Sequence, residues 1–121
     1  MTDRVVVTGI GLVTPVGSDR KSTWDGLLAG KSGADYISLF DAEGFTSRIA
    51  AEVNGFDPAA LLGRKVAKRL DRFSQFAAVA SLEALEDAGI DMATEDADRV
   101  GVLIGSGVGG IITITDQYNV L

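Results

Sequence analysis

The sequence predicts an α/β fold built around one long central helix. Residues 68–88 contain neither proline nor glycine and are rich in alanine and leucine, the strongest helix formers, and Gly89 follows as a helix-ending residue. Two runs of β-branched residues without polar alternation, 4–13 and 100–104, are typical of strands buried on both faces. Because the helix is apolar or small around most of its circumference from residue 76 to 85, we expect it to be buried between layers.

The elements before the central helix follow from local signals. A turn at residues 14–17 ends the first strand, and Ser18 is expected to cap a helix that runs to Ala29 and stops at Gly30. Three large side chains of this helix are expected to face inward: Trp24, Leu27 and Leu28. Residues 31–43 indicate a long connecting segment, and residues 47–53 a weakly favoured strand.

A second set of signals surrounds the central helix. Asp57 followed by Pro58 predicts a short capped helix over residues 58–62, and Gly63 marks a separate turn before the central helix. After Gly89, residues 90–99 form a segment rich in acidic residues, which indicates turns. The order of strands and helices predicts at least one crossover connection.

The polar face of the central helix has an unusual charge order. It carries Gln75, Glu83, Glu86 and Asp87. If the helix continues backwards, basic residues join the same stripe at helical spacing: Lys65, Lys68, Arg69 and Arg72. The stripe is then basic at its N-terminal end and acidic at its C-terminal end, the reverse of what the helix dipole favours. Spacing alone leaves two interpretations open, a solvated face and a surface for an acidic partner. For the carboxylates, a solvated face is favoured over acid–base catalysis.

Composition and charge limit the function classes. The 121 residues are 46% hydrophobic, which suits one domain, and the formal net charge of −6 argues against general nucleic-acid binding. Residues 64–72 nevertheless form a local basic island, with Asp71 as its single acidic residue. Such an island suits a small acidic partner.

The absence of cysteine and histidine is the strongest restriction. The chain has no disulfide, no thiolate nucleophile, no Ser/His or Cys/His pair and no zinc site of the usual kind. It contains no run of a transmembrane or signal-peptide type, so a cytoplasmic location without membrane contact is the default expectation.

Two glycine-rich stretches invite comparison with nucleotide-binding loops. Gly105, Gly107 and Gly110 satisfy the spacing of the dinucleotide pattern after a strand, whereas Gly9 and Gly11 lack the third glycine. The residues after Gly110 are poor helix formers, so no helix is expected to point at a bound phosphate. The alternative for both stretches is a tight strand exit with close backbone packing.

Four blocks of the sequence, in order and in register over essentially the whole chain, resemble the β-ketoacyl-acyl carrier protein synthases, most closely those of type II. The blocks are residues 4–17, residues 24–33, residues 64–73 with 84–89, and residues 99–110. The resemblance implies the N-terminal part of a thiolase-like αβαβα layered fold. Residues 1–121 would then be an incomplete N-terminal domain, covering about the first third of the enzyme.

The resemblance also implies a chemistry. The family transfers an acyl group from acyl carrier protein to a cysteine thiolate, and the carbanion left by decarboxylation of malonyl-carrier protein attacks the thioester. The cysteine and the two histidines fall outside these 121 residues in the family pattern, so the chain alone is expected to be inactive, and no cofactor or metal is implied. A polyketide ketosynthase and a non-catalytic module that binds carrier protein are the alternatives.

Two sets of residues in this chain take roles from the resemblance. Arg64, Lys65, Lys68 and Arg69 match the surface that receives acyl carrier protein. Val108, next to Gly107, matches the position that gates the acyl-chain pocket, where type II members usually carry isoleucine. The family is usually homodimeric, so we expect a homodimer.

Overall fold

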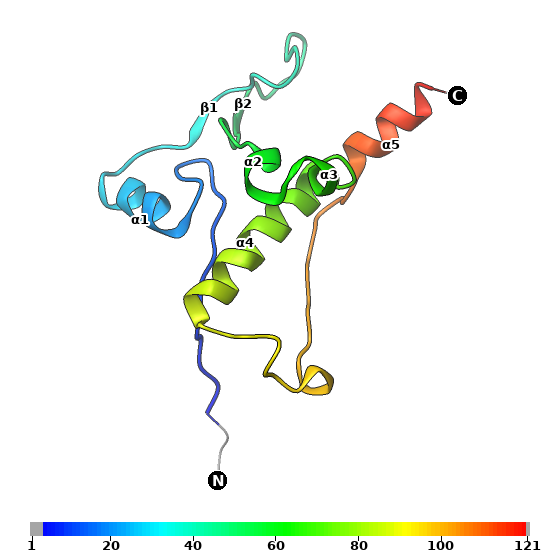
Figure 1. Cartoon of the computed structure of the whole chain (residues 1–121). Helices are drawn as coiled ribbons and strands as arrows, with labels where there is room; N and C mark the ends of the chain where they lie inside the picture. The colour runs from blue at the N-terminus through cyan, green and yellow to red at the C-terminus, as the bar shows by residue number, and fades with distance from the viewer. Residues whose placement is uncertain (1–3, 121) are drawn as a thin grey trace. The chain divides into compact units, whose positions relative to one another are not determined.

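The computed structural model describes residues 4–120 and divides into two compact units. One unit is Leu12–Phe56, and the other combines Met1–Gly11 with Asp57–Leu121. Figure 1 labels the helices and strands of both units. No helix within residues 4–120 has the length and apolar character needed to cross a membrane.

The smaller unit contains α1 (Arg20–Leu28) and an antiparallel pair formed by β1 (Ala34–Tyr36) and β2 (Ile49–Ala51), in which Asp35 faces Ala50. β2 lies inside the predicted strand at 47–53, which confirms that prediction. β1 lies within residues 31–43, where a connecting segment is expected, and no local pattern indicated a strand there. Its three residues become a strand through pairing with β2, and such a non-local partner is invisible to local patterns.

The first helix corrects two expectations. Its cap is Asp19 rather than Ser18: the Asp19 carboxylate accepts a 2.7 Å hydrogen bond from the Ser22 amide, and the Ser22 hydroxyl accepts one from the Asp19 amide. Three side chains expected to face inward are more than half exposed: Trp24, Leu27 and Leu28. The buried residues of α1 are the small Thr23 and Gly26, because this face packs against the turn at residues 14–17, where a Cβ on Gly26 would lie 3.0 Å from the Val16 carbonyl oxygen.

Within residues 4–120, the larger unit contains five helical elements. They are α2 (Pro58–Leu62), α3 (Arg64–Ala67), α4 (Arg72–Ala88), the 3-10 helix η1 (Ala97–Arg99) and α5 (Ile111–Tyr118). The Asp57 carboxylate caps α2 by accepting hydrogen bonds from the Ala59 and Ala60 amides, which confirms the predicted capped helix. Gly89 ends α4 in the left-handed conformation, with φ of 65°, which confirms the predicted helix end.

The basic residues before α4 do not continue that helix, contrary to the single-helix interpretation. Lys68 is the C-cap of α3, and α4 begins only at Arg72, after Asp71 in an extended conformation. The side-chain amide of Gln75 donates 3.0 Å hydrogen bonds to the carbonyl oxygens of Ala67 and Leu70. These bonds satisfy carbonyls that a continuous helix would have paired internally, so the break between α3 and α4 is stabilised by α4 itself.

The two strands expected at residues 4–13 and 100–104 are absent: within the described residues, both segments run without a strand partner. A buried strand needs neighbouring strands to pair its amides and carbonyls, and the described residues place none beside these segments. Residues 9–11 pack on α4 instead, and residues 102–106 face it across an open groove. A Cβ on Gly11 would overlap the Ala80 carbonyl oxygen, and one on Gly9 would overlap that of Ala84, which confirms the close-packing interpretation of these glycines.

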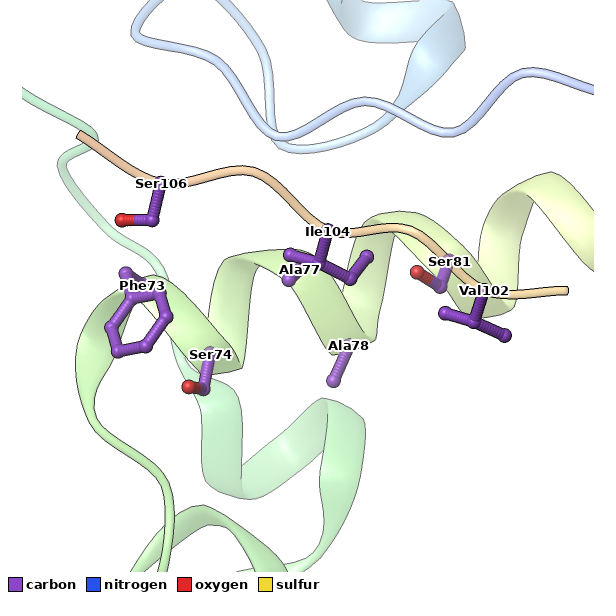
Figure 2. Close-up of a pocket in the computed structure, with 8 residues that line it drawn as sticks. All are labelled: Phe73, Ser74, Ala77, Ala78, Ser81, Val102, Ile104 and Ser106. Carbon is purple, nitrogen blue, oxygen red and sulfur yellow. The ribbon is translucent and has the colours of Figure 1, made fainter. Parts of the chain in front are cut away.

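In the segment after η1, side chains alternate in direction as in a β-strand, although the segment has no hydrogen-bonded partner strand within the described residues. Val102, Ile104 and Ser106 face α4, as Figure 2 shows, whereas the intervening Leu103 is 96% exposed. Side chains of one face therefore border the groove beside α4, although Val102 is still 84% and Ile104 52% exposed. Because no sheet covers it within the described residues, α4 is only half-buried along its length rather than enclosed by layers on all sides.

Candidate functional site: a basic surface and an apolar groove beside α4

The basic surface, defined as Arg64, Lys65, Lys68 and Arg69, lies on α3 and the turn that follows it. All four residues are exposed. Among the residues that the structure describes, no carboxylate forms an ion pair with any of them. Their charges are therefore directed at solvent and are open to an external anion.

The backbone beneath this surface is held firmly in place. Ala67 is only 6% exposed and carries one of the two carbonyls that accept from Gln75. α2 packs against both α3 and α4. An open groove of about 450 Å³ lies here, with two of the basic side chains on its rim; its lining residues are Pro58, Ala59, Arg64, Ala67, Lys68 and Gln75. Helical spacing places Gln75 on the polar face and does not indicate this anchoring role, because the role depends on the break between α3 and α4.

Two further residues of the predicted stripe are engaged within the chain. The guanidinium of Arg72 lies 4.9 Å from the centre of the Phe76 ring, a cation–π contact along α4. The Asp87 carboxylate accepts a 2.9 Å hydrogen bond from the Ile10 amide, so it is not simply a solvated charge. The exposed cations are thus concentrated before α4 rather than along it.

An apolar groove of about 410 Å³ runs along the first half of α4 (Figure 2). Five residues of α4 and three of the facing segment line it: Phe73, Ser74, Ala77, Ala78, Ser81, Val102, Ile104 and Ser106. Small side chains on α4 leave the space open. The groove offers apolar surface with three hydroxyl groups and no charged side chain, which suits an aliphatic group better than a polar one.

The glycine-rich loop, defined as residues 105–110, follows this groove directly. The Ser106 hydroxyl accepts a 3.0 Å hydrogen bond from the Gly109 amide, and Gly109 adopts φ of 80°. Val108 is 75% exposed, and Gly107 is exposed as well. Neither residue lines the groove in this structure, although Ser106 at the start of the same loop does.

A helix does follow the glycine-rich loop, contrary to the expectation from its poor helix formers. The Oδ2 atom of Asp71 accepts a 2.9 Å hydrogen bond from the Thr113 amide and a 2.6 Å bond from the Thr113 hydroxyl. These bonds, the hydroxyl first, lower the pKa of Asp71. An internal carboxylate therefore occupies the N-terminal end of α5, where a nucleotide phosphate would have to bind, and this argues against the dinucleotide interpretation.

The titratable side chains of the described residues form no metal-binding cluster. Within residues 4–120, no group of three or more Asp, Glu, His or Cys side chains has the arrangement needed to hold a metal ion. What the larger unit presents is a charged surface for contact and an apolar groove.

The chain shares its fold with the ketosynthases. It matches the structure titled "The ishigamide ketosynthase/chain length factor" with a TM-score of 0.72 and 30% identity, over 95% of this chain and 29% of that one. It matches a β-ketoacyl synthase from Burkholderia phymatum STM815 with a TM-score of 0.62 and 35% identity, over 80% of this chain and 24% of that one. The chain is therefore α/β and corresponds to the N-terminal part of a thiolase-like fold.

The family described as "Beta-ketoacyl synthase, N-terminal domain" matches residues 2–120, and the chain belongs to this family. Three similar curated relatives are each a 3-oxoacyl-[acyl-carrier-protein] synthase 2. The proteins of Coxiella burnetii, Synechocystis and Vibrio cholerae are 48%, 45% and 44% identical, respectively, over 118 residues. These alignments cover 98% of this chain and 28% of each relative.

Proposed function

We propose that this chain is the N-terminal segment of a 3-oxoacyl-[acyl-carrier-protein] synthase of fatty acid elongation. The identity of 44–48% to three synthases of that name, over 98% of the chain, carries the proposal. A ketosynthase of a polyketide pathway is less well supported, because the match to the ishigamide ketosynthase/chain length factor is 30% identical.

The reaction proposed for the complete enzyme is a decarboxylative Claisen condensation. The acyl group passes from the carrier thiol to an enzyme cysteine, malonyl-carrier protein loses CO₂, and the resulting carbanion attacks the acyl thioester to form the new carbon–carbon bond. These 121 residues include no cysteine or histidine, so they contribute neither nucleophile nor histidine donors to that step. We expect the chain alone to be inactive.

In this proposal the basic surface receives the acidic acyl carrier protein. Its four cations are exposed and lack acidic partners among the described residues, which keeps them available to an external anion. Exposed charges of this kind act mainly on association rate and orientation. The anchoring by Gln75 and Ala67 gives the surface a fixed backbone on which to present them.

Val108 and Gly107 are proposed to border the acyl chain. The apolar groove leads into the loop that carries them, and its lining suits an aliphatic chain. A valine at position 108 presents one methylene less than the isoleucine usual in type II members, so we expect a slightly roomier pocket.

We further propose that the complete enzyme is a cytoplasmic homodimer. The exposed apolar residues of α5 supply surface that a second subunit or another part of the enzyme would cover. Sedimentation of the complete enzyme would test the dimer.

The test of the function is a condensation assay with the complete synthase that carries this segment. Decanoyl-carrier protein and malonyl-carrier protein are supplied, and CO₂ release and the 3-oxoacyl product are measured together. We expect stoichiometric CO₂ and product. Carrier-protein binding without product would instead support a non-catalytic binding module, which the basic surface together with the absence of Cys and His in this chain also fits.

A further inference from the structure

Helix α5 forms from residues that do not favour a helix. Its first five positions, residues 111–115, are all β-branched, and the helix has only eight residues. Gly110 occupies the N-cap position and offers no side chain, and the first turn contains no acidic residue. An isolated helix of this length and composition is not stable in water, so its stabilisation must come from elsewhere.

The missing cap is supplied from the start of α4. Asp71 binds both the amide and the hydroxyl of Thr113, which is the third residue of α5, the position that an N-cap side chain normally serves. Its negative charge also lies at the positive end of the α5 dipole. Asp71 precedes α4 as that helix's own N-cap residue, yet α4 receives no side-chain cap hydrogen bond from it.

The glycine-rich loop is shaped to reach this carboxylate. A Cβ on Gly110 would lie 3.5 Å from Asp71 Oδ2 and 3.8 Å from the Phe73 ring, so the loop end packs directly on the start of α4. At its other end the loop begins at Ser106, which lines the apolar groove. The loop is exposed at positions 105–108. Inside it, the Gly109 amide donates a hydrogen bond to the Ser106 hydroxyl.

We propose that Asp71 is a positioning residue for acyl-chain selection: by capping α5 through Thr113, it fixes the end of the loop that carries Val108. This inference rests on the proposed function, because it assigns the loop to the acyl-chain pocket. Without the cap, the first turn of α5 unwinds and Val108 is no longer held at one distance from the groove. The prediction is a changed preference among acyl chains rather than a general loss of activity.

The test compares variants of the complete synthase that carries this segment. Asp71→Ala removes the cap, Thr113→Val removes the hydroxyl donor, and Thr113→Ser keeps both donors and should restore wild-type behaviour. Asp96→Ala is the matched control, because Asp96 is also a capping carboxylate but serves η1. The first readout is the ratio of kcat/KM for decanoyl- and hexadecanoyl-carrier protein. We expect about a fivefold change in this ratio for Asp71→Ala, a smaller one for Thr113→Val and none for the other two.

The second readout is hydrogen exchange of the α5 amides, which does not depend on activity. We expect about fivefold faster exchange in α5 for Asp71→Ala and no change in α4. Unchanged α5 exchange, or an equal loss of kcat/KM for both acyl chains, would overturn the positioning role of Asp71. A wild-type enzyme without condensation activity would instead refute the proposed function, and the selection role would be refuted with it.

Discussion

The Ile10 amide donates a 2.9 Å hydrogen bond to Oδ2 of Asp87, which lies 77 positions later in the sequence. This bond fastens a segment without a strand partner to the C-terminal half of α4. Asp87→Ala should lower the free energy of unfolding by about 1 kcal/mol and speed exchange of the Ile10 amide. Asp87→Asn, which keeps an acceptor oxygen, should have a smaller effect. Glu86→Ala, at an exposed position on the same helix, is the control, and equal exchange in all three variants would contradict the role of this bond.

Gly11 lies where any side chain would strike the backbone of α4. A Cβ there would overlap the Ala80 carbonyl oxygen and lie 2.7 Å from the Ala84 nitrogen. Because helix backbone cannot move aside cheaply, Gly11→Ala should destabilise the protein by about 1–3 kcal/mol in urea unfolding. Gly101→Ala is the control, since nothing lies within 4 Å of its added methyl group. Similar midpoints for both variants would show that the segment does not pack on α4 in solution.

Reversing two charges of the basic surface should weaken carrier-protein docking. In the complete synthase, the double variant Lys68→Glu with Arg69→Glu should raise KM for acyl-carrier protein roughly tenfold at low salt and leave kcat nearly unchanged. The difference should shrink as salt is added, because the charges are exposed. The matched control reverses Lys31 and Arg48, two exposed cations of the other unit. If both double variants have the wild-type KM, docking occurs elsewhere.

Val108→Ile should narrow the acyl pocket. The added methylene corresponds to about 0.8 kcal/mol of apolar contact, or a change of about fourfold in the relative kcat/KM for long and medium acyl chains, in favour of the shorter chain. Val120→Ile, at another exposed valine, should leave the profile unchanged. Superimposable profiles for Val108→Ile and the wild type would remove Val108 from the pocket.

The stability of α5 should depend on pH in the acid range, because its cap is the Asp71 carboxylate. Hydrogen bonds from Thr113 lower the pKa of Asp71 from its ordinary value of 3.8, so the ionised carboxylate favours the folded state. The stabilisation is therefore fully present above about pH 4 and is lost as the pH falls through the lowered pKa. NMR of α5 amides should show this loss in the wild type and not in Asp71→Asn. The pKa of Asp19 is also lowered, first by its bond from the Ser22 amide, so α1 should still respond in that variant and serve as an internal reference.

Local capping signals predicted two helix ends correctly, although the cap of α1 is Asp19 rather than the expected Ser18. Asp57 with Pro58 located α2, and Gly89 located the end of α4, because each of these signals acts within a few residues of itself. Propensity alone failed for α5, since its cap comes from Asp71, 42 positions away. It also failed at the start of α4, where the break depends on the side chain of Gln75 reaching back to Ala67.

The two apolar runs have the residue types of buried strands, but the prediction that they pair in a sheet was wrong. Residues 4–13 and 100–104 have strand character, yet a ladder is a property of two segments, and among the described residues these segments lie beside a helix and not beside a strand. For the candidate site, the exposure of the basic residues could be predicted, whereas their place on the separate helix α3 could not. The groove could not be predicted either, because it depends on small α4 side chains meeting Val102 and Ile104.

The exposed apolar surface around Leu103 makes folding within one molecule compete with association between molecules. Residues 100–105 present apolar side chains and main-chain groups without a ladder, and such an edge pairs as readily with a second molecule as with its proper neighbours. Pairing within one molecule is independent of concentration, whereas mispairing between molecules accelerates as the protein becomes more concentrated. The yield of native protein should therefore rise when refolding is carried out at higher dilution.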